Sequence, residues 1–285
     1  MRREIDGDDS VEEEERGEMV AGAKLLVLPL ASIIVHRAHV RTPETIPKTR
    51  RPDFSYGKFK VYKRPFCEGF LKFCFERFQV GLWSSAMEHN LQKVLTHALG
   101  DLQNEFVFTW DQNQCTETGF MCLHNQKKPV FLKQLKFIWE KYPSEKYSSS
   151  NILLITDPEK ALLNPPNTGI FPKKYDFDNE DDDFLGPNGE LRAYLDGLSN
   201  AKDVPNYVKD HSFGEPAITP SHPDWNLAVS GLLCTGDRLT TLFYSGLSPE
   251  SPCSGEQQHQ IDKAVVGFSS TGDHRRTPFS SVISA

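Results

Sequence analysis

Polar side chains follow two apolar segments of this sequence, at positions where buried strands would end. Ser84 comes directly after Val80–Trp83. Thr156 and Asp157 come directly after Leu153–Ile155. A carboxylate can hold a cation, but Asp157 alone is a weak candidate for a Mg²⁺ ligand. Mg²⁺ sites usually need more than one carboxylate, or one carboxylate together with a substrate phosphate.

A third apolar segment ends in residues that carry no reactive group. Leu25–Leu28 is apolar throughout, and Pro29 and Ala31 follow it. Neither side chain can attack a substrate, ligate a metal ion or transfer a proton. Pro29 also lacks the backbone N–H that a residue of a central strand donates.

Apolar segments of strand length alternate with helical stripes along the chain. The expected strands are Leu25–Leu28, Val80–Trp83, Phe106–Phe108, Asn151–Ile155 and Thr168–Phe171. The expected helices cover about 66–78, 87–99, 132–139 and 191–198. This alternation predicts an α/β fold with a doubly wound, mostly parallel sheet. Because ligands bind at the carboxyl ends of strands in such sheets, Ser84, Thr156 and Asp157 lie where an active site is expected.

Three stretches interrupt this alternation. Residues 36–60 are polar and basic and contain several prolines, which predicts a long inserted loop. Residues 111–130 are also polar and show no clear period. The acidic segment Asp176–Asp183 is expected to be a solvated loop.

The helix expected at 87–99 follows two serines. Ser84 or Ser85 is expected to cap this helix.

Composition divides the 285 residues into one domain with non-globular ends. Residues 1–22 are acidic without an apolar period, which predicts disorder. The folded core is expected at 23–224, and 225–285 is rich in Ser, Gly, Pro and Thr, which predicts a second disordered segment. The acids of the N-terminal arm account for most of the net charge of −7, so the rest of the chain is nearly neutral.

This charge distribution and the apolar pattern exclude several classes of function. A nearly neutral body offers no basic stripe for nucleic acid. No apolar run is long enough for a membrane span, and the acidic start is unlike a secretory or mitochondrial leader. We therefore expect a nuclear or cytoplasmic protein. The six cysteines contain no C-x-x-C pair, and Cys67 and Cys74 are expected to be reduced thiols in or near the core.

Several motifs resemble one known family in the right order. They are Val61–Cys67, Phe73–Phe78, Trp83–Ala86 and Ala161–Thr168. Together they resemble the NLI-interacting-factor, or RNA polymerase C-terminal-domain phosphatase, homology domain, most closely its plant branch. The resemblance covers about residues 24 to 224 and implies a haloacid-dehalogenase-like, Rossmann-type fold.

The resemblance also implies roles for individual positions. In the family's enzymes an aspartate attacks the phosphoryl group, a carboxylate two residues later moves protons, and Mg²⁺ neutralises charge. Pro29 and Ala31 stand at those two positions. Ser84 matches a hydroxyl that holds phosphate, and Lys133 matches a lysine that opens a helix and provides a point charge for phosphate. In the fourth motif Thr156 replaces the first of two acids, which leaves Asp157.

These substitutions lead to one main hypothesis and two alternatives. The main hypothesis is a catalytically inactive phosphatase-like domain that binds proteins, including phosphorylated Ser/Thr-Pro segments, through Ser84 and Lys133, without a cofactor. The first alternative is a Mg²⁺-dependent Ser/Thr protein phosphatase that uses Asp157. The second is a subunit related to the presequence-translocase receptor of the mitochondrial inner membrane, if the gene model lacks its N-terminal part. The competing interpretation, of equal weight, is that Ser84 caps a helix and that Lys133 is a solvated lysine.

Overall fold

The computed structural model describes residues 24–122, 125–143, 146–225 and 228. The predicted disordered arm at 1–22 lies outside the described residues. The predicted tail at 225–285 does so as well, except for residues 225 and 228. Within the described ranges, no helix is long and apolar enough to cross a membrane.

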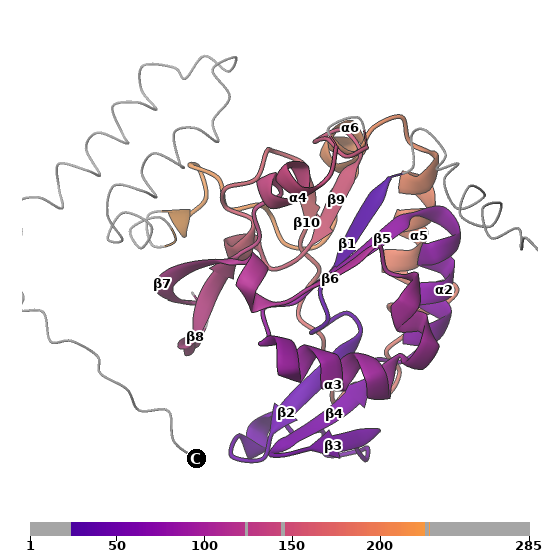
Figure 1. Ribbon diagram of the computed structural model, residues 1–285, viewed down its shortest axis with the longest axis vertical. Coiled ribbons are helices and arrows are strands. Elements are labelled where there is room, and N and C mark those ends of the chain that lie inside the picture. Colours follow the sequence, from indigo (N-terminus) through magenta and orange to yellow (C-terminus); the bar gives the residue numbers. More distant parts are fainter. Residues whose placement is uncertain (1–23, 123–124, 144–145, 226–227, 229–285) are drawn as a thin grey trace, which may run out of the picture.

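A five-stranded parallel sheet forms the centre of the molecule (Figure 1). Its order is β10 (Gly169–Ile170), β9 (Ile152–Ile155), β1 (Leu25–Leu28), β5 (Gln79–Trp83) and β6 (Phe108–Trp110). The chain builds β5 and β6 on one side of β1 and then crosses to add β9 and β10 on the other. This arrangement confirms the predicted α/β class and the doubly wound parallel sheet.

Strand β1 is buried on both faces because helices cover the sheet on both sides. Leu26 and Leu28 pack in a core with α2 (Cys67–Arg77), α3 (Glu88–Ala98) and α5 (Glu190–Asn200). Leu25 and Val27 pack on the opposite face with α4 (Lys136–Lys141). Alternate side chains of a strand point to opposite faces, so a strand covered on both sides must be apolar at every position. That requirement explains why the apolar runs could be assigned as strands.

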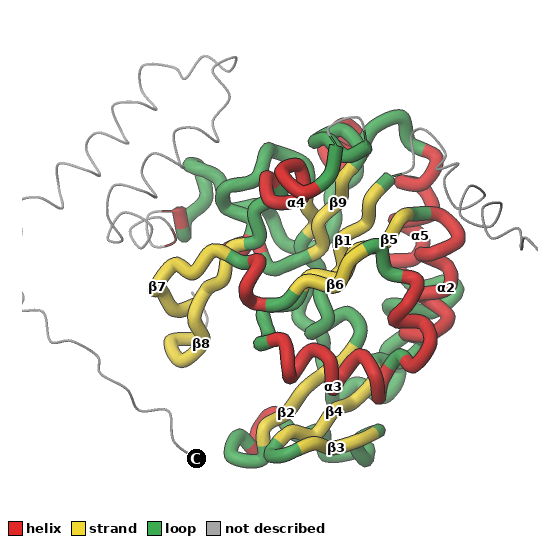
Figure 2. The backbone as a smooth tube through the Cα atoms, viewed as in Figure 1, coloured by secondary structure: helices red, strands yellow, loops and turns green. Residues whose placement is uncertain are grey.

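The inserted segment that was expected to be a loop forms a second sheet. Strands β2 (Val35–His39), β4 (Phe59–Lys63) and β3 (Phe54–Tyr56) pair antiparallel in that order. The prediction of a loop was wrong because these strands are short and rich in polar and basic residues, so they contain no apolar run. The small sheet lies beyond the end of β1, next to α3 (Figure 2).

Residues 111–130 also contain regular structure. Strands β7 (Thr116–Cys122) and β8 (Asn125–Leu132) form an antiparallel hairpin that projects from the body (Figure 1). The polar start of β8 conceals its strand character in the sequence. Leu132, which was expected to begin a helix, is the last residue of β8, and α4 begins four residues later.

Smaller differences concern the ends of elements. The third expected strand lies two residues later than predicted, so Asp111 follows it directly. An additional helix, α6 (Val204–Asp210), follows α5 and begins with Asp203 as its N-cap. Cys67 and Cys74 are free and buried on α2, as expected.

Candidate functional site

Three neighbouring strands deliver the predicted positions to one edge of the sheet. Strands β9, β1 and β5 are adjacent and parallel, so their carboxyl ends lie side by side. Pro29 follows β1, Ser84 follows β5, and Thr156 and Asp157 follow β9. The sequence-predicted positions are therefore brought together at the sheet's carboxyl edge.

Lys133 reaches this edge from the end of the hairpin and is almost completely buried. Only 1% of the residue is exposed, and its Nζ donates a hydrogen bond of 2.6 Å to the carbonyl oxygen of Trp83, the last residue of β5. It precedes α4 by three residues and does not open that helix, contrary to expectation. Burial, followed by the charge of Lys160, lowers the pKa of Lys133 to about 7. Lys133 is thus a buried lysine and not a solvated one.

The backbone around Lys133 is fixed by a conspicuous set of hydrogen bonds. Asn164 donates from Nδ2 to the carbonyl oxygen of Lys133 at 2.8 Å and accepts at Oδ1 from the backbone N–H of Leu135 at 2.8 Å. The N–H of Lys133 donates to the carbonyl oxygen of Lys160 at 2.9 Å. These bonds tie the lysine segment to the loop that follows β9.

Asp157 is held by a lysine three residues further along. The Nζ of Lys160 lies 2.6 Å from Oδ2 of Asp157, and the short 3-10 helix Pro158–Lys160 brings the two side chains to the same side. Burial opposes the charge of Asp157, but the Lys160 ammonium outweighs it and lowers the pKa of the carboxyl to about 2. Burial likewise opposes the charge of Lys160, and Asp157 reverses this so that the pKa of Lys160 is raised. The pair is ionised at neutral pH.

A third lysine adds to the positive charge. Lys128 lies exposed on β8, and the neighbouring Lys160 ammonium is the main cause of its lowered pKa. Sequence reasoning missed both Lys128 and Lys160. The i,i+3 spacing of Asp157 and Lys160 was a usable local signal, whereas Lys128 depends on a hairpin that the sequence pattern did not predict.

The two hydroxyl groups of the edge differ in their hydrogen bonding. Ser84 is buried, and its Oγ accepts a hydrogen bond of 3.1 Å from the N–H of Ala86. It does not cap α3, and neither does Ser85, because the N-cap of α3 is Met87 and no side chain caps that end. The Oγ1 of Thr156 is buried and has no hydrogen-bond partner within the described part of the chain. The same holds for four other buried side-chain atoms of the described residues, among them the Oγ of Ser85, so this state by itself does not mark a ligand site.

The loop after β1 is shaped by an arginine from outside the site. Arg64 donates from Nη1 to the carbonyl oxygen of Ser32 at 2.8 Å, and Ser32 has a positive φ of 72°. The guanidinium also makes a two-pronged ion pair with Asp182, with both distances at 2.8 Å. The rings of Tyr175 and Phe184 lie 4.4 Å from its central carbon. The expectation that residues 176–183 form a merely solvated loop is therefore wrong for Asp182, whose side chain is 10% exposed.

The residues at this edge do not fit Mg²⁺. The carboxylate of Asp157 is already paired with Lys160, and Pro29, Ala31 and Thr156 supply none. Asp111 follows β6, but its Oδ1 accepts from the N–H of Asn113 at 2.6 Å and caps a 3-10 helix. In the ranges that the structure describes, no three His, Cys, Asp or Glu side chains are grouped to hold a metal ion. Mg²⁺ prefers several oxygen ligands in octahedral geometry, which this set does not provide.

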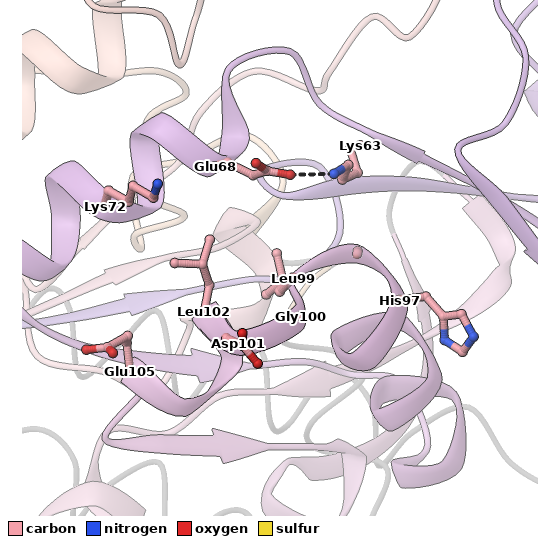
Figure 3. Close-up of a pocket in the computed structure, with 10 residues that line it drawn as sticks. Lys63, Glu68, Lys72, His97, Leu99, Gly100, Asp101, Leu102 and Glu105 are labelled. Carbon is pink, nitrogen blue, oxygen red and sulfur yellow. Dashed lines mark hydrogen bonds and ion pairs between the residues drawn. The ribbon is translucent and has the colours of Figure 1, made fainter.

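A cavity of about 460 Å³ lies elsewhere, between the start of α2 and the end of α3 (Figure 3). Its walls carry charges of both signs, from Lys63, Lys72, Glu68, Asp101 and Glu105. Glu68 is already ion-paired with Lys63. None of the predicted site residues lines this cavity, and its mixed charge selects no class of ligand.

Comparison with known proteins assigns the chain to a family. Among curated proteins, none matches this sequence significantly. Two solved structures are similar: an arginine-to-alanine variant of the fission yeast RNA polymerase II CTD phosphatase Fcp1 bound to beryllium fluoride, and Fcp1, an essential RNA polymerase II CTD phosphatase. The first has 11% identity and a TM-score of 0.37, covering 90% of this chain and 67% of that one. The second has 12% identity and a TM-score of 0.38, covering 91% of this chain and 70% of that one.

The family model gives the decisive match. The model of the NLI interacting factor-like phosphatases matches residues 24–205, which include all five strands of the parallel sheet and the segments that carry Ser84, Lys133 and Asp157. The chain therefore belongs to the NLI interacting factor-like phosphatase family.

Proposed function

We propose that this chain is a phosphatase-like domain that binds phosphorylated segments of other proteins and does not hydrolyse the phosphate. One observation carries this proposal: the carboxyl edge of the sheet holds an excess of positive charge. Lys128, Lys133 and Lys160 interact there with only two carboxylates, those of Asp157 and Glu159. Lysine ammonium groups of this kind bind phosphate as point charges.

The burial of Lys133 and Lys160 supports an anionic ligand. Placing like charges together in a protein interior is unfavourable unless opposite charge compensates them. Lys133 is 1% exposed, and its lowered pKa reflects this cost. A phosphoryl group at the edge would supply the missing negative charge. It would also offer acceptor oxygens to the buried hydroxyl of Thr156, which has no partner among the described residues.

The absence of turnover follows from the residue types at the end of β1. Covalent phosphoryl transfer needs a nucleophile, and Pro29 carries none. Ala31 cannot donate or accept a proton. Removing one member of a catalytic unit already lowers rates by orders of magnitude, and here several are replaced. Binding and charge stabilisation are the functions that the remaining residues can perform.

The proposal is tested by calorimetry with a peptide that contains a Ser-Pro step, in its phosphorylated and unphosphorylated forms. We expect the phosphorylated peptide to bind at least about tenfold more tightly. Lys133→Met should remove this preference because it keeps the side chain's length and deletes its charge. Lys136→Met, at the start of α4, serves as the matched control and should behave as the wild type. Equal affinity for both peptides, or no binding of either, would contradict the proposal.

A further inference from the structure

We propose that the ammonium group of Lys160 takes the place of a divalent metal ion at this site, so that the chain binds a phosphate monoester without metal. This inference rests on the proposed function and specifies how the ligand is held. It begins from the contact between Lys160 and Asp157. The family resemblance implies a metal at the acids of the fourth motif, and the remaining acid is bonded to a lysine of the same chain at 2.6 Å.

The exposure of Lys160 and Asp157 indicates that the Lys160 side chain stays in place beside Asp157. The side chain of Lys160 is 10% exposed, whereas that of Asp157 is 38% exposed. A buried ammonium requires a paired carboxylate, and removing the partner of a buried pair is strongly destabilising. A Mg²⁺ ion that bound Asp157 would have to displace Lys160 and leave its charge buried without a partner. Binding of a metal ion to the Asp157 carboxylate would therefore cost the free energy of the Lys160–Asp157 ion pair.

The backbone fixes Lys160 relative to the other phosphate-binding candidates. Its carbonyl oxygen accepts from the N–H of Lys133 at 2.9 Å, and the Lys133 side chain reaches the carbonyl oxygen of Trp83 beside Ser84. The charge of Lys160 lowers the pKa of both Lys128 and Lys133, and Lys128 also lowers that of Lys133. An anion at the edge would meet ammonium groups on two sides, as it meets a lysine and a metal ion in a metal-dependent site.

The edge carries a net positive charge without a metal ion. With Lys128, Lys133 and Lys160 protonated, the carboxylates of Asp157 and the nearby Glu159 leave an excess of one positive charge. A phosphate monoester carries about −1.5 to −2 at neutral pH, so this excess offsets part of its charge. The ligand class that fits is a phosphate monoester.

The first experiment measures binding of the phosphorylated Ser-Pro peptide to the full chain by calorimetry, once with excess EDTA and once with millimolar Mg²⁺. We expect the two affinities to agree within about twofold. An affinity that rises about tenfold or more with Mg²⁺ would overturn the inference.

Substitution of Asp157 changes the affinity for the peptide in opposite directions, depending on whether Lys160 or a metal ion provides the positive charge. With Lys160 as the cation, Asp157→Asn leaves the affinity in EDTA unchanged or raises it, because a negative charge is removed from an anion site. With a metal ion ligated by Asp157, the same variant loses binding. Lys160→Gln should lower the affinity about tenfold or more, and Lys160→Arg should retain part of it. Lys209→Gln, at an exposed position of α6, is the control and should match the wild type.

The outcomes separate this inference from the proposed function. If the phosphorylated peptide binds only with Mg²⁺, or if Asp157→Asn abolishes binding while its circular dichroism stays native, the proposed function stands and the role of Lys160 is wrong. If the peptide binds under no condition, both are wrong. A gain of affinity in Asp157→Asn cannot arise from misfolding, so this variant tests the inference even if the Lys160 variants are unstable.

Discussion

The loop after β1 and the loops after β8 and β9 lie at the same edge of the sheet but are built in different ways. The loop after β1 presents Pro29 and Ala31, and its backbone is held by Arg64 from outside the edge. The other two loops present Lys133, which donates to the carbonyl oxygen of Trp83, and Asp157, which is paired with Lys160. The comparison shows that the shape of a site and its chemistry can depend on separate residues. A loop can keep a defined backbone after the residues that carried a reaction have been replaced.

The largest effect is expected from removing the charge that supports the loop after β1. Asp182→Asn leaves the buried guanidinium of Arg64 without a counter-charge, and breaking a buried ion pair costs about 3–5 kcal/mol. Asp196→Asn is the matched control, because Asp196 also accepts from an arginine, Arg77, but is 57% exposed. That exposed pair should contribute less than about 1 kcal/mol.

Urea unfolding measures both changes as free energies of unfolding. Equal costs for the two variants would contradict the supporting role of the Arg64–Asp182 pair. A normal stability of Asp182→Asn would show that the loop after β1 keeps its shape without it.

An intermediate effect concerns the pH dependence of anion binding at the lysine loops. The pKa of Lys133 is about 7, so this group is an ammonium at pH 6 and mostly an amine at pH 8. An anion binds the protonated form, so affinity for sulfate should fall by about several-fold to tenfold from pH 6 to pH 8. Sulfate keeps its charge throughout this range. Calorimetry on the wild type and on Lys133→Arg, which stays charged, measures the difference.

The neighbouring groups do not mask this effect. The pKa of Asp157 is about 2 and that of Lys160 is raised, so both keep their charge between pH 6 and 8. Burial raises the pKa of Cys115, which stays a thiol. Lys128 has a lowered pKa, and the variant Lys128→Gln measures how much this residue contributes to the pH dependence of sulfate binding. An affinity that stays constant with pH in the wild type would argue against a ligand beside Lys133.

The smallest effect is expected from returning a carboxylate to β1. Pro29→Asp places a potential nucleophile at the end of the central strand, but Ala31 and Thr156 still supply no acid and Lys160 still occupies Asp157. We expect hydrolysis of an aryl phosphate with Mg²⁺ to stay at the background rate, as in Pro29→Asn. Clear turnover by Pro29→Asp would show that the lysine loops retain enough of the machinery for catalysis.

The parallel sheet could be predicted from the sequence because burial on both faces requires continuous apolar segments. Leu25–Leu28 and Ile152–Ile155 must be apolar at every position when helices cover both sides. Strands β2 to β4 and the hairpin contain no such continuous apolar segment. Their polar residues follow no regular alternation with apolar ones, and pairing between strands decides their structure.

The positions at the edge could also be predicted, but their environments could not. Ser84 and Asp157 follow apolar strands, which is visible locally. The burial of Lys133 depends on the carbonyl oxygen of Trp83, fifty positions earlier in the chain. A backbone acceptor leaves no mark in the side-chain pattern. The ion pair between Arg64 and Asp182 escaped prediction for the same reason, since 118 positions separate the two residues.

The central place of β1 has a consequence for the synthesis of the protein. Leu25 pairs with Gln79 on one side and with Ile152 on the other, so its second neighbour is made 127 residues after it. At a translation rate of about 5–20 residues per second, β1 waits roughly 6–25 seconds for that partner. During this time an entirely apolar strand has one edge open, and such edges are prone to aggregation. The nascent chain is therefore expected to need a chaperone until β9 has left the ribosome.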